Sequence, residues 1–175
     1  IAPVLRDMQA GKSILQCQFP WLDGLSGRAL FAAWRQGAEA CADAFARADP
    51  KARLKWLGPD MSALSSVTAR QMETWAHGQD VVDVVGVERP ATARLRHVAH
   101  IGVRARPFSY AVNGREAPTA DVYVALDAPN DERWEWGDPG SDDRVTGPAL
   151  DFCLVVTQRR HLADTSLVVD GAVAA

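Results

Sequence analysis

The sequence predicts an α+β protein whose N-terminal part is helical and whose C-terminal part mixes strands with a helix. Two long segments repeat apolar residues with the period of an α-helix, and neither has a proline in its interior. After Pro107 the apolar residues alternate instead, and turn-forming residues separate the short runs. This change of period predicts two domains, one over residues 1–106 and one over residues 107–175.

The first long helix is expected over residues 22–48, where Asp49 and Pro50 supply its end. We interpret residues 1–20 as the tail of an earlier helix followed by a connection. The apolar residues that recur at helical spacing are expected to form the core of a helical bundle; they are Leu30, Phe31, Trp34, Ala38, Cys41 and Phe45.

The second long helix is expected over residues 62–85, after a loop over residues 51–60. Asp60 or Ser62 can cap its start, and Gly86 supplies its stop.

One stripe of this second helix carries three ionisable side chains, because residues three and four apart share a helix face. Glu73, His77 and Asp80 fall on this stripe, which continues to Val84, and we expect it to face inward. Burying even a neutral polar group without a partner costs roughly 2–7 kcal/mol. These ionisable groups therefore need each other or a cation.

Glu73 and His77 are the candidate metal ligands, because side chains at i and i+4 of a helix can reach one ion. Asp80 can accept the other ring N–H of His77 and fix its tautomer, or it can hold a metal-bound water. The alternative interpretation is a polar network that ties two helices together without a metal.

A third helix is expected over residues 91–104, with Pro90 in its first turn. His97 and His100 lie three residues apart on this helix. Because arginines flank them, we expect both histidines on a basic, partly solvated face rather than at a metal.

The C-terminal part is expected to contain four strands, over residues 108–112, 121–126, 133–136 and 166–169. Apolar residues alternate with polar ones in the second of these strands, so one face of the sheet is predicted to be buried. A helix over residues 147–158 is expected to cover that face through Leu150, Cys153, Leu154 and Thr157.

Arg159, Arg160 and His161 form a cationic cluster just after this last helix. Positive charge is favoured at a helix C-terminus by the macrodipole, which is a sufficient structural reason for the cluster. The functional alternative is that Arg159 binds a substrate carboxylate with two hydrogen bonds.

Composition excludes several classes of protein. A formal net charge of −3 over 175 residues gives no electrostatic footprint for nucleic acid. No run of about 18 apolar residues predicts a membrane span, and no secretory signal is visible. The three cysteines are far apart in apolar surroundings and are interpreted as buried free thiols, so we expect a cytoplasmic protein.

Three segments of the chain, over residues 56–63, 69–80 and 147–153, resemble metal-binding proteins related to mycothiol-dependent maleylpyruvate isomerase. Those proteins belong to the DinB-like four-helix bundle superfamily. The resemblance implies a DinB-like helical bundle followed by a small α+β domain similar to a sterol-carrier domain. The excess of arginine over lysine and the abundance of alanine agree with an actinobacterial source.

The resemblance also implies a divalent metal, usually zinc, held by a histidine of an early helix and by the Glu and His of an E-x-x-x-H-x-x-D helix. Glu73, His77 and Asp80 match that motif. No histidine precedes His77, and the chain opens at Ile1 rather than Met, so we expect it to lack the first helix or helices of the bundle. His97 or His100 could replace the missing ligand, but we do not favour this.

Two functions remain open. The first is a metal- and thiol-dependent isomerase or S-transferase, with mycothiol as a cosubstrate, Asp80 as the candidate catalytic residue and Arg159 as the candidate substrate-binding residue. The second is a non-catalytic protein that binds a metal or a hydrophobic ligand. The sequence indicates neither the substrate nor the oligomeric state.

Overall fold

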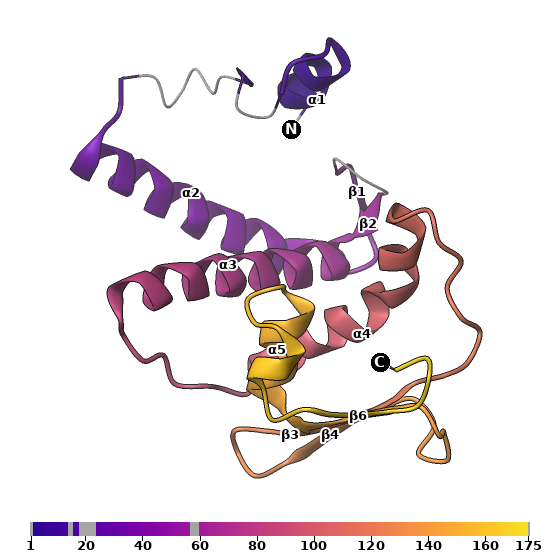
Figure 1. Ribbon diagram of the computed structural model, residues 1–175. Coiled ribbons are helices and arrows are strands. Elements are labelled where there is room, and N and C mark those ends of the chain that lie inside the picture. Colours follow the sequence, from indigo (N-terminus) through magenta and orange to yellow (C-terminus); the bar gives the residue numbers. More distant parts are fainter. Residues whose placement is uncertain (1, 14–15, 18–23, 57–59, 175) are drawn as a thin grey trace. The chain divides into compact units, whose positions relative to one another are not determined.

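The computed structural model describes residues 2–13, 16–17, 24–56 and 60–174 (Figure 1). The described residues form five α-helices, a two-stranded sheet and a four-stranded sheet, so the predicted mixture of helices and strands is confirmed. The chain divides into two compact units, residues 1–67 and residues 68–175, which are described separately. None of the described helices is both long and apolar enough to cross a bilayer.

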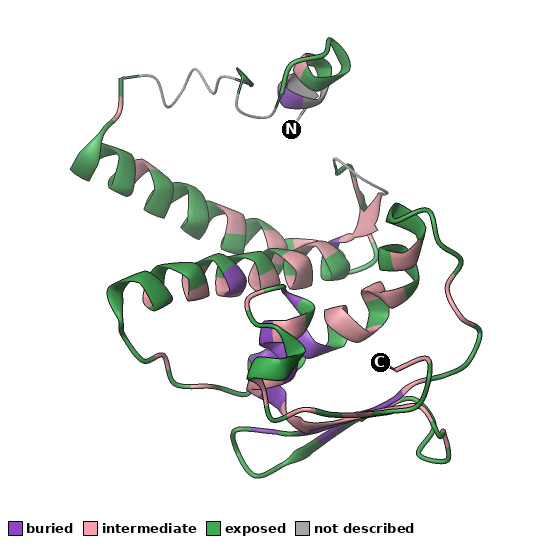
Figure 2. Cartoon of the chain, in the orientation of Figure 1, coloured by how far each residue is buried: buried purple, intermediate pink, exposed green. Residues whose placement is uncertain are grey.

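The first unit contains helices α1 (Ala2–Gln9) and α2 (Gly27–Arg47). Helix α2 lies within the predicted range 22–48, of which residues 22 and 23 fall outside the described part of the chain. No residue of α2 is buried, so the prediction that its apolar stripe forms a core is wrong for this structure (Figure 2). An apolar stripe marks a face that can be buried, but burial needs a facing element.

A short antiparallel pair interrupts the region that was expected to be helix and loop. Strand β1 (Arg53–Leu54) pairs with β2 (Met61–Ser62), and the backbone N–H of Ala63 extends the pairing by donating to the carbonyl of Ala52 at 2.8 Å. The expectation of only loop and helix over these residues is therefore wrong. Residues 57–59, which are part of the first resembling segment, lie outside the described residues.

Helix α3 (Ala63–Val85) agrees with the predicted helix over residues 62–85. Ser62 caps its start, because its Oγ accepts a hydrogen bond from the backbone N–H of Ser65 at 3.1 Å. Gly86 ends the helix with a φ of 67°, and the N–H of Val87 bonds to the carbonyl of Val82 at 3.1 Å.

Helix α4 (Leu95–Val112) is longer than predicted and runs through Pro107, so the strand expected over residues 108–112 is wrong. The real stop is at Gly114, which has a φ of 67° and is followed by a bond from the N–H of Arg115 to the carbonyl of Tyr110 at 2.9 Å. The same Asn-Gly pair that favours a hairpin turn therefore ends a helix here. The predicted boundary between residues 106 and 107 falls inside α4.

The four-stranded sheet has the order β4-β3-β5-β6. Strand β3 (Tyr123–Asp127) runs antiparallel to β4 (Arg133–Trp136) and parallel to β5 (Arg144–Pro148), and β5 runs antiparallel to β6 (Val168–Asp170). Strands β3, β4 and β6 lie within a few residues of their predicted positions. Strand β5 was not predicted, because Gly147 and Pro148 were interpreted as the start of the following helix.

Helices α4 and α5 (Ala149–Val156) lie on one face of the sheet (Figure 1). The main cluster of buried residues lies where these helices meet β3 (Figure 2). They are Leu95, Val98, Ala99, Val124, Leu126, Ala128, Trp134, Ala149, Phe152 and Cys153.

Strand β3 is buried on both faces, whereas burial of only one face was predicted. On the second face Tyr123 is covered by polar neighbours: its hydroxyl donates to Glu135 at 2.6 Å, and the guanidinium of Arg144 lies 5.8 Å from its ring centre. Strand β3 lies between β4 and β5, and Glu135 of β4 and Arg144 of β5 cover this face.

The three cysteines are free thiols, as predicted. Cys17 and Cys153 are buried as predicted, whereas Cys41 is only half-buried. Burial raises the pKa of the Cys153 thiol to about 12. A thiol with so high a pKa stays protonated near neutral pH and is a poor nucleophile.

Candidate functional site

The candidate site is a polar cluster on an exposed side of α3. The side chains of Glu73, His77 and Asp80 are 58%, 69% and 50% exposed, so the prediction that their stripe faces inward is wrong. Helix α3 instead packs through the side next to this stripe, where Ala76 is buried and Met72 and Trp75 contact the core.

His77 uses its two ring nitrogens in different directions. Nε2 lies 3.2 Å from Oε2 of Glu73, one turn back along the helix, and Nδ1 lies 3.3 Å from Oδ2 of Asp80. The three residues therefore converge as their spacing suggested. The carboxylate of Glu73 and that of Asp80 lie on opposite edges of one imidazole.

This arrangement limits what the cluster can do with a metal. Within the described part of the chain, no three His, Cys, Asp or Glu side chains converge in a way that could hold an ion. Because Asp80 faces Nδ1, only Glu73 and Nε2 of His77 share a direction. Zinc takes at least three protein ligands, so these residues fit as two donors of a zinc site but do not complete one.

The histidines considered as replacements lie elsewhere. His97 and His100 are exposed on α4, as expected, and Nδ1 of His100 is 3.2 Å from the indole Nε1 of Trp136. That contact occupies one nitrogen of His100 as an acceptor.

Arg159, from the segment after α5, joins the α3 cluster. It makes two parallel hydrogen bonds to Asp80, from Nε to Oδ1 at 3.1 Å and from Nη2 to Oδ2 at 2.9 Å, while Nη1 donates to the carbonyl of Thr157. Nη2 also lies 3.3 Å from Nδ1 of His77. The hydrogen bond from Arg159 is the main reason why the pKa of Asp80 is lowered, which keeps this carboxylate ionised.

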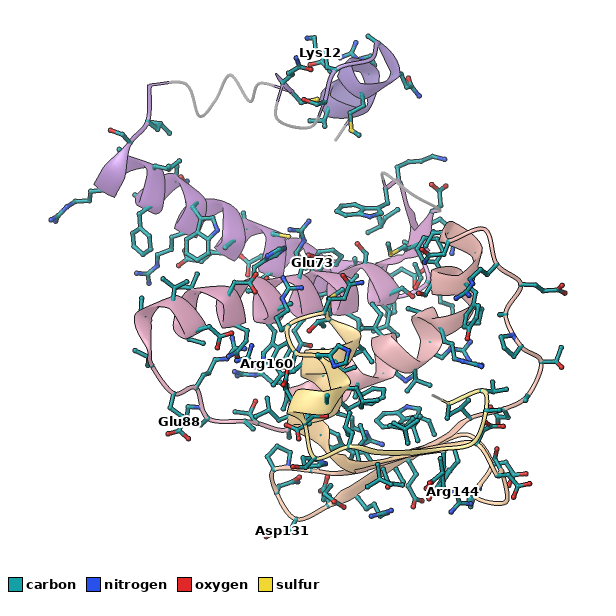
Figure 3. The ribbon with its side chains drawn as sticks, in the orientation of Figure 1. Lys12, Glu73, Glu88, Asp131, Arg144 and Arg160 are labelled. Atoms are coloured by element: carbon teal, nitrogen blue, oxygen red, sulfur yellow. The ribbon has the colours of Figure 1, made fainter. Side chains whose placement is uncertain are left out.

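Arg160 makes a second bidentate pair, which was not predicted from the sequence. Its Nη1 and Nη2 donate to the two carboxylate oxygens of Asp83 at 2.8 and 2.9 Å, and Figure 3 labels Arg160 beside α3. The hydrogen bond from Arg160 is the first cause that lowers the pKa of Asp83 to about 2, and Gln79 adds a further bond at 2.8 Å. Two acids at i and i+3 and two consecutive arginines were the available signal, but 77 residues separate the partners.

The end of α5 aims both arginines at α3. Gln158 has a φ of 62°, a left-handed conformation that is uncommon for a residue with a side chain. It reverses the chain so that the N–H of Arg159 bonds to the carbonyl of Leu154 at 2.8 Å. His161, the third member of the predicted cationic cluster, instead accepts a bond from the N–H of Ala163 at 3.2 Å.

Arg89, in the loop after α3, contacts the part of that helix that carries Trp75 and Gln79. Its Nη1 and Nη2 both donate to the carbonyl of Trp75 at 3.1 Å, its guanidinium lies 5.0 Å from the Trp75 ring centre, and Nη2 donates to Gln79 at 2.8 Å. A Cβ at Gly78 would lie 2.9 Å from Nη1 of Arg89. Gly78 therefore leaves the space that the guanidinium occupies.

Comparison with known proteins supports the N-terminal resemblance. Two curated proteins from two strains of Mycobacterium tuberculosis, both named as uncharacterized (MT0041 and Rv0036c), are each 53% identical to this chain over 111 residues. The matched region covers 63% of this chain and 43% of each relative, so the match spans less than half of the relatives' length. No solved structure matches the chain.

A family model also matches, over residues 2–82, and it is described as the mycothiol maleylpyruvate isomerase N-terminal domain. The matched range includes Glu73, His77 and Asp80 but ends before Asp83 and the arginine pair. Residues 2–82 of this chain are therefore related to the N-terminal domain of the mycothiol maleylpyruvate isomerases, the family that the sequence motifs indicated.

Proposed function

We propose that this chain is part of a divalent-metal-binding enzyme that carries out a thiol-dependent isomerisation or S-transfer, with mycothiol as the thiol cosubstrate. The observation that carries the proposal is the convergence of Glu73, His77, Asp80 and Arg159 on one exposed site. The family match over the first three of these residues supports it.

Glu73 and Nε2 of His77 are the proposed metal ligands. Oε2 of Glu73 and Nε2 of His77 lie 3.2 Å apart, close enough for both to hold one ion. When bound, a divalent ion would lower the pKa of a thiol so that the thiolate forms at neutral pH. A third ligand has to come from outside the Glu73–His77 pair.

Asp80 and Arg159 compete for Nδ1 of His77 in this proposal. An arginine can only donate hydrogen bonds, so Nδ1 accepts from Arg159 when the ring proton is on Nε2. When Nε2 has no proton and is free to bind a metal, Nδ1 carries the proton and donates a hydrogen bond to Asp80. Asp80 therefore orients the ligating histidine, the role that a carboxylate partner has at many zinc sites.

Arg159 is the proposed binding group for a substrate carboxylate. Its guanidinium already holds a carboxylate, that of Asp80, with two parallel bonds, and this is the geometry that an arginine offers to a carboxylate ligand. A substrate carboxylate would share the Arg159 guanidinium with Asp80 or replace Asp80 on it.

A non-catalytic function is the second candidate, and the pairing of the cluster favours it. Glu73, His77, Asp80 and Arg159 each have a partner within 3.3 Å, so they can act as a polar network that ties the end of α5 to α3. On this interpretation the metal is structural or absent, and the C-terminal α+β unit, proposed to be sterol-carrier-like, binds a hydrophobic ligand.

Metal content and thiol dependence separate the two candidates. The protein, purified with its native termini, should retain about one zinc or similar ion per chain, and His77→Ala should abolish retention because it leaves one of the two named ligands. His97→Ala, which removes an exposed histidine on α4, is the matched control and should keep the ion. With maleylpyruvate as the probe substrate, turnover should require added mycothiol; undiminished metal in His77→Ala and no thiol dependence would favour the non-catalytic candidate.

A further inference from the structure

Two bidentate ion pairs fasten the segment after α5 to α3, one through Nε and Nη2 of Arg159 and one through Nη1 and Nη2 of Arg160, but only the first faces the candidate site. We propose that the Asp83–Arg160 pair is an anchor that positions Arg159 over Asp80. Arg160 is thus a positioning residue, and it acts through its neighbour in the chain.

The spacing of the four residues makes this coupling direct. Asp80 and Asp83 stand about one helical turn apart on α3, and consecutive residues of the segment supply one guanidinium to each carboxylate. Each pair is bidentate, which fixes the orientation of a guanidinium as well as its distance. If Arg160 is held, the backbone of Arg159 is held with it; Nη1 of Arg160 also donates to the carbonyl of Arg159 at 2.7 Å.

The neighbours of the two acids differ. Asp83 accepts from Gln79, whose Oε1 accepts from Arg89, whose guanidinium is bonded to the carbonyl of Trp75 in the partly buried part of the helix. Asp80 has the exposed His77 as its other neighbour. The Asp83 end of the segment is therefore tied into the scaffold, whereas the Asp80 end opens onto the polar cluster.

The role of Arg159 as a ligand-binding group rests on the proposed function. An anionic ligand that takes the guanidinium of Arg159 displaces Asp80 from it. The anchor keeps the segment on α3 while this exchange takes place, so Arg159 does not have to be repositioned each time.

Side-chain NMR of ¹⁵N-arginine in the full chain tests the anchor directly. The Nε–H of Arg159 is bonded to Asp80 and should exchange slowly with solvent; Arg159→Lys identifies its resonance. Asp83→Asn and Arg160→Gln should each speed this exchange on the order of tenfold, within the usual range of coupling between linked sites. Glu88→Gln is the matched control for Asp83→Asn, since each removes one negative charge and Glu88 lies just after α3 (Figure 3).

The indole N–H of the buried Trp134 provides the internal reference, because its exchange reports on opening of the core. Faster exchange at Arg159 with an unchanged Trp134 supports the anchor. Unchanged exchange at Arg159 in both variants overturns it, as does equal acceleration in Glu88→Gln or equal acceleration at Trp134. The measurement needs neither metal nor thiol, so a failure of the proposed function would not alter its result.

Discussion

The core around α5 and the polar face of α3 are held together by different forces. In α5 four of the eight residues are buried, namely Ala149, Phe152, Cys153 and Leu154, whereas Glu73, His77 and Asp80 on α3 are each at least 50% exposed. Yet the segment that leaves α5 supplies the two arginines of the polar face. Apolar burial thus fixes where the segment starts, and charge pairing fixes where it points, so the two can be changed separately.

The largest expected effect is on the core. Leu126 is 0% exposed in the middle of β3, and Leu126→Ala should lower the free energy of unfolding by about 2–5 kcal/mol, because it removes buried methyl groups and leaves a cavity. Chemical denaturation followed by tryptophan fluorescence measures the change. The metal affinity of the folded variant should stay at its wild-type value.

Phe31→Ala on α2 is the control for that prediction. The Phe31 side chain is 57% exposed and stacks on Trp34 with ring centres 5.8 Å apart. Its removal should change the free energy of unfolding by no more than about 0.5 kcal/mol, as is usual at the surface. A loss as large as that of Leu126→Ala would mean that α2 has a buried face in solution.

The second effect belongs to the polar face. Asp80→Asn should weaken metal binding on the order of 10–100-fold, because it removes the carboxylate that orients His77, and it should change the free energy of unfolding little. Competition with a chromogenic chelator measures the affinity.

Asp142→Asn, in the exposed turn before β5, is the charge-matched control for Asp80→Asn. Equal weakening in the two variants would show that general charge matters rather than the orientation of His77. Unaltered affinity in Asp80→Asn would remove Asp80 from the site and leave it to the network with Arg159.

Much of the fold could be predicted from local signals in the sequence. Helix α3 has a capping serine at Ser62 and a stop at Gly86, and both signals act within one turn of the helix end. Strand β4 was predicted to the residue because turn-forming residues flank it on both sides.

The errors arose where one local signal has two outcomes. Asn113 and Gly114 suit a hairpin turn and a helix stop equally well, and the choice between them depends on whether the preceding residues are already helical. Helix α4 is anchored through its buried Leu95 and Val98, and it continues past Pro107, which removes only one backbone donor. The residues before Asn113 are thus already helical, so Asn113 and Gly114 end a helix here, although the last turn is exposed at Phe108 and Val112.

The candidate site was predictable only along α3. The spacing of Glu73, His77 and Asp80 gave their common face, because a helix fixes which residues meet. It did not give the exposure of that face, nor the pairing of Asp80 with Arg159, which depend on how distant segments pack. Asp83 and Arg160 were missed for the same reason.

A smaller effect is expected at the link between the two regions. Gln158 has a left-handed φ of 62° at the end of α5, a conformation that glycine adopts with less strain. Gln158→Gly should raise the free energy of unfolding by about 0.5–1 kcal/mol and keep the segment on α3. Gln158→Ala is the matched control, since it shortens the side chain without relieving the backbone. Equal effects of the two substitutions would assign the gain to the side chain instead.

The smallest effect is the dependence of stability on pH in the acid range. Asp83 has its pKa lowered to about 2 in the folded protein, chiefly by the hydrogen bond from Arg160, whereas an unfolded aspartate titrates near about 3.9. The folded pKa is the lower one, so the contribution of this pair is present above about pH 4 and is lost as the pH falls toward 2. Asp83→Asn should therefore flatten the fall in stability between pH 5 and pH 2, measured by urea denaturation at a series of pH values.

High salt should shrink the difference between wild type and Asp83→Asn, because both partners of the ion pair are partly exposed and their attraction is screened. Parallel curves for wild type and variant at low salt would mean that the ion pair adds nothing to the stability of the fold.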